Sequence, residues 1–192
     1  FLEKVERSLQ MISNLVQTQK ETVNGKDYSR LYDLNELVRE VVGLDELHLA
    51  KLNIKIEIDI PEKFEVFIAK NLFSRVILNL IKNAREALEQ TEQENKIIWI
   101  KASLDVAAGK WMLSITDNGP GVDKDFQSRL FVHGQTTKQK GHGFGISSCQ
   151  HAVRMFDGDI TFEEPLDQDH GARFILSMPL HEEIRIGAPL SA

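Results

Sequence analysis

Cysteine, positive charge and long apolar runs are scarce in this sequence of 192 residues. Its one cysteine, Cys149, excludes an intramolecular disulfide and a metal cluster built from cysteines, and it fits a reducing compartment. The formal net charge is -6 and no segment is rich in Lys and Arg, so nucleic acid is not expected as the main partner. No apolar run reaches the length that spans a bilayer, and no signal peptide is visible. We therefore expect a cytoplasmic location without direct membrane contact.

The first segment carries an apolar stripe with the spacing of a coiled coil. Its residues, at intervals of three and four interrupted at Gln19, are Leu2, Val5, Leu9, Ile12, Val16 and Val23. This pattern predicts a helix ~35 Å long. Because the stripe is narrow, we expect residues 1–23 to pair with another helix, in a homodimer or from upstream in the chain; the alternative is an amphipathic helix packed on its own domain. Asn24 and Gly25 end the helix, and residues 26–31 are expected to form a linker. Since the sequence starts inside this pattern, we expect it to be part of a longer protein.

The rest of the chain, to about residue 181, has the periodicities of an α/β domain. Asp33 and Glu36 form a capping box before a helical pattern that continues to about Ala50. Periodicity predicts further helices over 71–90 and 146–156, and strands over 54–60, 64–67, 96–104, 110–116, 159–163 and 172–178. This order predicts a two-layer α/β sandwich, in which helices cover one face of a mixed, mainly antiparallel sheet.

One acidic residue ends a predicted strand and begins a glycine-rich loop. Asp117 has the same strand parity as Trp111, Leu113 and Ile115, so its carboxylate is expected to point inward. A buried carboxylate is costly unless a donor meets it, and the amino group of a purine would be such a donor. The glycines at positions 119 and 121 allow the backbone to turn and to approach a flat ring closely.

A second glycine cluster precedes the helix predicted over 146–156. Gly141, Gly143 and Gly145 leave backbone N–H groups uncovered at the positive end of the helix dipole, which suits phosphates. The polar and basic loop between the clusters, residues 135–140, is expected to act as a lid. A glycine triplet alone is also typical of an ordinary turn or helix C-cap.

Two asparagines lie one turn apart on the long helix predicted over 71–90. Asn79 and Asn83 share one face, although asparagine is mildly unfavourable within a helix. A functional interpretation is a Mg²⁺ site, because an amide oxygen can complete an octahedron made of phosphate and water oxygens. The alternative is structural, with the two amides bonding each other or a loop carbonyl.

These segments, in this order, resemble the successive motifs of the ATP-binding domain of sensor histidine kinases. The matching stretches are Asn79-Leu-Ile-Lys-Asn83-Ala-Arg-Glu-Ala87, Asp117-Asn-Gly-Pro-Gly121, Leu130-Phe131, Thr136-Thr-Lys138, Gly141-His-Gly-Phe-Gly145 and Gly171-Ala-Arg-Phe174. The superfamily also contains type II topoisomerases, mismatch-repair ATPases and a heat-shock chaperone. The resemblance covers residues 30–180 and implies the Bergerat-type ATP-binding fold. The sequence around Asn83 is most similar to that of nitrogen-regulation sensor kinases.

The resemblance implies a division of the chain and a set of ligands for ATP and Mg²⁺. Residues 1–25 would be part of the dimerisation hairpin, residues 32–181 the catalytic domain and residues 182–192 a tail. Asn83 would be the metal ligand, and Asn79 would line the phosphate channel. The other implied nucleotide contacts are Asp117, Gly119, Gly121, Val122, Thr137, Lys138, Gly141, His142, Gly143, Phe144 and Gly145.

One position separates kinases from their hydrolytic relatives. Where those ATPases have a glutamate that activates water, this sequence has Asn79, whose amide cannot take a proton at neutral pH. The resemblance therefore implies slow hydrolysis and transfer of the γ-phosphate, with Asn79 and Lys138 as the catalytic residues. Two departures from the family pattern are Ala172, where threonine is frequent, and Glu86, where many relatives have a basic residue.

None of the six histidines matches the family's phosphoacceptor motif. We therefore expect the acceptor histidine on a helix upstream of Phe1, and a response-regulator receiver domain as the next phosphate acceptor. The expected function is the core of an autophosphorylating protein-histidine kinase of a bacterial two-component system, soluble or the cytosolic part of an inner-membrane sensor. The alternatives are a hydrolytic ATPase clamp and a non-catalytic nucleotide-binding dimerisation module.

Overall fold

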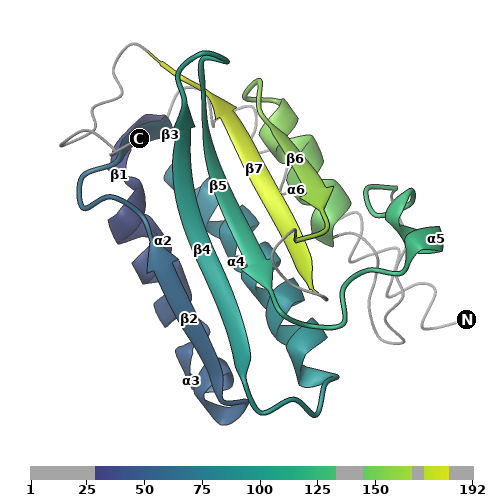
Figure 1. The fold of residues 1–192 in the computed structure, drawn as a ribbon. Helices are drawn as coiled ribbons and strands as arrows, with labels where there is room; N and C mark the ends of the chain where they lie inside the picture. Colours follow the sequence, from purple (N-terminus) through teal and green to yellow (C-terminus); the bar gives the residue numbers. More distant parts are fainter. Residues whose placement is uncertain (1–28, 133–144, 166–170, 182–192) are drawn as a thin grey trace, which may run out of the picture.

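A five-stranded sheet forms one layer of the structure and helices form the other (Figure 1). The computed structural model describes residues 29–132, 145–165 and 171–181. Within these residues the sheet contains, in spatial order, β2 (Ile54–Asp59), β4 (Lys96–Asp105), β5 (Lys110–Asp117), β7 (Ala172–Pro179) and β6 (Asp159–Glu163). Strands β2 and β4 are parallel, and the other neighbouring pairs are antiparallel. The predicted mixed, mainly antiparallel sheet is confirmed.

The longer helices lie together on one face of this sheet, as Figure 1 shows. They are α2 (Leu34–Gly43), α4 (Lys70–Glu89) and α6 (Gly145–Arg154), and two shorter helices are α3 (Glu46–Lys51) and α5 (Lys124–Gln127). Helix α4 lies behind the central strands in this view, and its apolar stripe is buried. Helix α2 begins where the capping box predicts, because Asp33 Oδ1 accepts from the backbone N–H groups of Asn35 and Glu36 at 2.8 and 3.1 Å. The predicted two-layer sandwich is confirmed.

The core is organised around the inward side of β5. Trp111, Leu113 and Ile115 alternate along this strand and are at most 1% exposed. The ring of Trp111 packs against Phe64 and Phe73, with centroids 6.4 and 6.3 Å apart. Burying an apolar side chain of this size contributes about 2 kcal/mol relative to leaving it in water. The position of β5 at the centre of the sheet is therefore strongly fixed.

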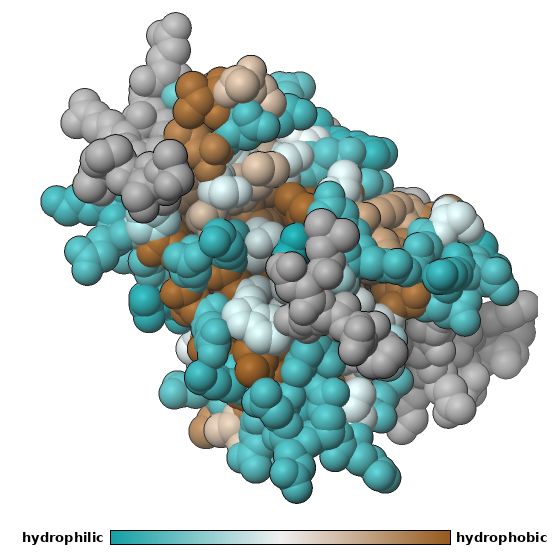
Figure 2. All heavy atoms as spheres, in the orientation of Figure 1, coloured by the Kyte–Doolittle hydropathy of each residue, from teal (hydrophilic) through white to brown (hydrophobic). Residues whose placement is uncertain are grey.

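The opposite face of the sheet is open and largely polar. On it, Trp99 is half-buried and donates its indole N–H to Glu57 Oε2 at 2.9 Å. The exposed side chains of Lys101 and Asp59 form an ion pair at 3.0 Å on the same face. Figure 2 shows that hydrophilic side chains dominate this side of the molecule, with hydrophobic side chains between them. One layer of helices thus suffices to cover the apolar face of the sheet.

The structure differs from the sequence prediction at the first helix and the first strand. The helix predicted to continue to Ala50 ends at Gly43, a residue that is unfavourable within a helix. Beyond this break, Asp45 is 3% exposed and forms an ion pair with Arg85 at 2.8 Å. Strand β1 (Arg30–Asp33), which the sequence analysis did not predict, pairs antiparallel with β3 (Glu65–Ile68) as a separate sheet. It begins inside the range assigned to a linker.

The predicted N-terminal helix and the tail lie outside the described residues. The residues concerned are 1–25 and 182–192, so the domain boundaries stay predictions. In the part of the chain that the structure describes, no helix has both the length and the apolar character needed to cross a bilayer.

Candidate functional site

Asp117 lies at the end of the central strand β5, with its carboxylate inside the protein. The residue is 2% exposed, and its neighbours across the sheet are Ile98 on β4 and Ala172 on β7. Burial raises the pKa of Asp117 from 3.8 to about 6, against the opposing effect of backbone N–H groups of Gly119 and Ala172. These partners are neutral, so the carboxylate keeps acceptor capacity for a further donor.

The loop after β5 is packed too closely for larger residues. The backbone N–H of Gly119 donates to Asp117 Oδ1 at 2.9 Å, and a Cβ at this glycine would lie 2.8 Å from the same oxygen and 3.4 Å from Cβ of Ala87. Gly121 has a φ of +77°, and a Cβ there would lie 2.9 Å from the carbonyl oxygen of Gly171. Both glycines of this loop therefore allow other parts of the protein to approach the backbone closely. The predicted approach of a flat ring stays a prediction.

Asn118 fixes this loop from the other side, and the sequence analysis did not identify its role. Its Nδ2 donates to the carbonyl of Asn95 at 2.7 Å, and its Oδ1 accepts from the backbone N–H of Ile97 at 2.8 Å. Gln93 Nε2 also donates to the carbonyl of Asn118 at 3.0 Å. These contacts tie the segment between α4 and β4 to the position next to Asp117. A pattern of D-N-G-P-G alone does not reveal them.

The two predicted asparagines lie on one face of α4, half-buried and one turn apart. Asn79 Oδ1 is the nearest atom, at 3.9 Å, to a Cβ built at Gly145, the first residue of α6. Ala87, two turns further along the same face, faces Gly119. One stripe of α4, with Asn83 in its middle, thus runs ~12 Å from the start of α6 to the loop after β5. This is the length scale of a nucleoside triphosphate.

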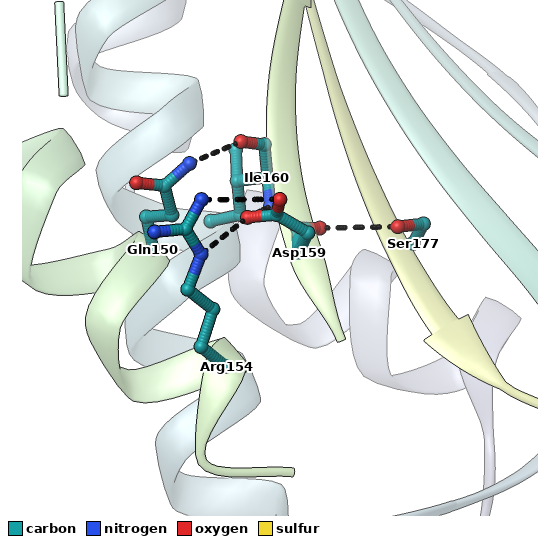
Figure 3. A network of polar contacts seen from close by, with 5 residues as sticks. All are labelled: Gln150, Arg154, Asp159, Ile160 and Ser177. Atoms are coloured by element: carbon teal, nitrogen blue, oxygen red, sulfur yellow. Dashed lines mark hydrogen bonds and ion pairs between the residues drawn. The ribbon is translucent and has the colours of Figure 1, made fainter. Parts of the chain in front are cut away.

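Helix α6 is held against the edge of the sheet by a polar network, drawn in Figure 3. Gln150 Nε2 donates to the carbonyl of Ile160 at 2.8 Å, and the Arg154 guanidinium bonds both carboxylate oxygens of Asp159 at 3.0 and 3.2 Å. Ser177 Oγ donates to the carbonyl of Asp159 at 3.4 Å. Although burial raises the pKa of Asp159, hydrogen bonds from Arg154 and Ile160 outweigh it and hold the pKa below its usual value. The network fixes the second half of α6 relative to the edge strand β6.

The single cysteine is a core residue of α6. Cys149 is 4% exposed, and burial raises the pKa of its thiol to about 11. The thiol is therefore protonated at neutral pH and is not a reactive nucleophile. Its sulfur accepts a hydrogen bond from Asn79 Nδ2 at 3.3 Å. This partner is neither the second amide nor a loop carbonyl, which were the partners in the structural alternative.

The donor set on α4 fits a magnesium ion that takes most of its ligands from phosphate and water. Among the described residues, no group of three or more His, Cys, Asp or Glu side chains could hold a metal. Asn79 and Asn83 instead offer neutral amide oxygens, which are hard ligands. This set agrees with the predicted role of Asn83, since Mg²⁺ bound with a triphosphate needs few protein ligands.

Comparison with known proteins identifies the family. The sequence profile of the histidine kinase-, DNA gyrase B- and HSP90-like ATPases matches residues 69–182. The chain belongs to this ATPase family. The match includes both asparagines of α4, Asp117 with its glycine loop, and α6.

Relatives of this ATPase domain are sensor kinases. The chain is 25% identical over 149 residues to sensor protein TdiS of Thauera aromatica, covering 77% of the chain and 27% of that protein. It is 33% identical over 157 residues to adaptive-response sensory kinase SasA of Prochlorococcus marinus strain MIT 9303, covering 77% and 40%. The chain therefore spans well under half the length of these relatives.

Solved structures show the same fold. The nucleotide-free catalytic domain of histidine kinase ThkA is similar with a TM-score of 0.67 and 28% identity, covering 79% of this chain and 95% of that one. ThkA in complex with the response regulator protein TrrA is similar with a TM-score of 0.66 and 26% identity, covering 92% and 50%. The chain is thus a histidine-kinase-type ATPase domain, as the sequence motifs predicted.

The structure brings together only part of the predicted ligand set. It places Asp117 with Gly119, and Asn79 with Gly145, at the two ends of the α4 stripe, and it places Val122 half-buried after the loop. Thr137, Lys138, Gly141, His142, Gly143 and Phe144 lie outside the described residues. Glu86, where many relatives have a basic residue, is half-buried. The roles of all these residues toward a ligand stay predictions.

Proposed function

We propose that this ATPase domain is the catalytic core of a sensor histidine kinase, which binds Mg-ATP and transfers its γ-phosphate to a histidine upstream of residue 1. The observation that carries the proposal is the stripe on α4. This stripe extends from the loop beside the buried carboxylate of Asp117 to the start of α6. It presents an amide, Asn79, where a hydrolytic ATPase needs a carboxylate.

Asp117 would select the adenine base. Its carboxylate already accepts from the backbone N–H of Gly119 at 2.9 Å and has further lone pairs for the exocyclic amino group of adenine. Guanine presents a carbonyl at the same place, and two acceptors facing each other in a buried site repel. The close-packed glycines would let the flat base lie against the backbone, with Val122 contributing an apolar contact.

The triphosphate would extend along α4 to the N-terminal end of α6. Helix α6 has ten residues, so its dipole favours negative charge at Gly145. Asn83 would hold Mg²⁺ through its amide oxygen, and the ion would supply positive charge to the phosphate oxygens. Lys138 in the lid, together with Thr137 and the segment 141–144, would complete the phosphate contacts.

An amide at position 79 would leave the γ-phosphate for a nucleophile other than water. Asn79 cannot remove a proton from water at neutral pH, so hydrolysis would be slow and the phosphate would pass to an incoming imidazole. A receiver domain would then accept it, as the complex of ThkA with the response regulator TrrA supports. Residues 1–23 would form the homodimer through a helical hairpin, and the domain would work in the cytosol.

The test is phosphate transfer from γ-labelled ATP in a version of the protein extended upstream through the preceding helix. The expected result is a protein label that is labile in acid and stable in base, which identifies phosphohistidine. Asp117→Asn and Asn83→Asp should each abolish the label. Asn71→Asp is the matched control, because this exposed asparagine of α4 undergoes the same chemical change away from the stripe.

The other outcomes identify the alternatives. Rapid release of free phosphate without a protein label would contradict the proposal and indicate a hydrolytic clamp, with the half-buried Glu86 as the next candidate base. ATP binding with neither label nor release would indicate a nucleotide-binding module without catalysis.

A further inference from the structure

The amide of Asn79 has a defined orientation between α4 and α6. Its nitrogen, Nδ2, donates to Cys149 Sγ at 3.3 Å. Its oxygen, Oδ1, lies 3.9 Å from a Cβ built at Gly145. The nitrogen end of the amide is therefore engaged with the core of α6, and the oxygen end faces the beginning of that helix.

Cys149 is suited to hold this orientation. The residue is 4% exposed on a helix that Gln150 and Arg154 anchor to β6, so the sulfur has little freedom relative to α4. A neutral thiol is a weak donor but carries lone pairs, and a buried amide N–H without an acceptor would lose its hydrogen bond to water. Turning the amide over would lose this N–H···S bond and would require the weakly donating S–H to turn toward the amide oxygen instead.

We propose that Cys149 is a positioning residue that keeps the amide oxygen of Asn79 toward the nucleotide, so that Asn79 acts as an acceptor for magnesium or its bound water. This inference rests on the proposed function. With the opposite orientation, Asn79 would present an N–H donor, which could bond phosphate oxygens directly. Cys149 would thereby make nucleotide binding depend on the metal.

The measured quantity is the ratio of the ATP dissociation constants without and with magnesium. It is obtained by calorimetric titration of the 192-residue chain with ATP in Mg²⁺ or in a chelator. Removal of the acceptor by Cys149→Ala should lower this ratio about fivefold, the factor that corresponds to one hydrogen bond. Cys149→Ser keeps an acceptor of similar shape at the same place and should preserve the ratio.

Two further variants separate positioning from packing. Cys149→Val removes the acceptor while keeping apolar volume, so it should lower the ratio even if the alanine variant does not fold. Val153→Ala, at a fully buried position of the same helix, makes a cavity without touching Asn79. It should lower the melting temperature and leave the ratio unchanged.

Each outcome decides one proposal. A ratio that stays within twofold of the wild type in the alanine and valine variants would overturn the role of Cys149. So would a serine variant that behaves like the alanine variant, or a Val153→Ala variant that lowers the ratio equally. A wild-type chain that binds no ATP with magnesium would instead overturn the proposed function.

Discussion

The buried carboxylate of Asp117 should make the stability of the nucleotide-free protein depend on pH in a defined direction. The residue is 2% exposed, and burial raises its pKa from 3.8 to about 6. The difference, at 1.36 kcal/mol per pKa unit, corresponds to about 3 kcal/mol of destabilisation when the group is ionised. The site thus costs the fold a substantial part of a typical stability.

The sign follows from proton binding. Between pH 3.8 and about 6 the folded protein holds a proton on Asp117 that the unfolded chain has lost. The free energy of unfolding should therefore fall as the pH rises through this window, and the contribution should be constant above it. Below pH 3.8 both states are protonated and the cost disappears.

The assay is urea unfolding of the wild type and of Asp117→Asn from pH 4 to pH 8. The difference in the free energy of unfolding between the two proteins removes the contributions of the other titrating groups, which both proteins share. This difference should shift by about 2 kcal/mol in favour of the variant as the pH rises. The new amide adds a cost for its buried N–H groups, but that cost does not depend on pH. A difference that stays constant over this range would refute the reasoning, because it would show an ordinary pKa for Asp117.

Three substitutions test the rest of the site and its support. Gly145→Ala adds a methyl group that lies in ordinary contact with Asn79 Oδ1, at 3.9 Å, so the melting temperature should rise by an amount equivalent to roughly 0.5–1 kcal/mol. Calorimetry should show weaker Mg-ATP binding, and unchanged binding would contradict this. Asn79→Glu introduces a base for water, so phosphate release without an acceptor should increase at least tenfold in a malachite green assay, whereas Asn79→Gln should not increase it. Arg85→Leu removes the ion-pair partner of Asp45, which is 3% exposed, and leaves it with His48 at 3.0 Å. Urea unfolding should therefore show a free energy of unfolding lower by about 2 kcal/mol. An unchanged value would show that this ion pair does not hold the turn between α2 and α3.

The alternation of side chains along a strand predicted that Asp117 is buried, because this period of two follows from the strand backbone itself. Trp111, Leu113 and Ile115 determine which side of β5 is buried, and Asp117 follows in register. The period of the long helix similarly predicted α4 to within one residue at each end. The helices and strands with strong periodicity were therefore predicted with nearly correct bounds.

The elements that the sequence did not predict depend on contacts between distant residues. The helical pattern continues past Gly43, but α2 ends there, and the ion pair between Asp45 and Arg85, forty positions apart, holds the turn that follows. Strand β1 has only four residues and is a strand because it pairs with β3. Neither contact has a local signal, since each depends on how α4 and β3 pack in three dimensions.

In the candidate site too, the sequence predicted the position of a side chain but not its distant contact partner. The sequence identified Asn79 because a polar residue on a half-buried helical face needs a partner, but that argument does not specify the partner. The structure supplies this partner as Cys149, a buried thiol seventy residues away. A residue that packs as a core side chain can thus also determine the chemistry of its neighbour. In the proposed function, the amide at position 79 would present a hydrogen-bond acceptor to the nucleotide, and the same amide would lack the proton-accepting ability that a base for hydrolysis requires.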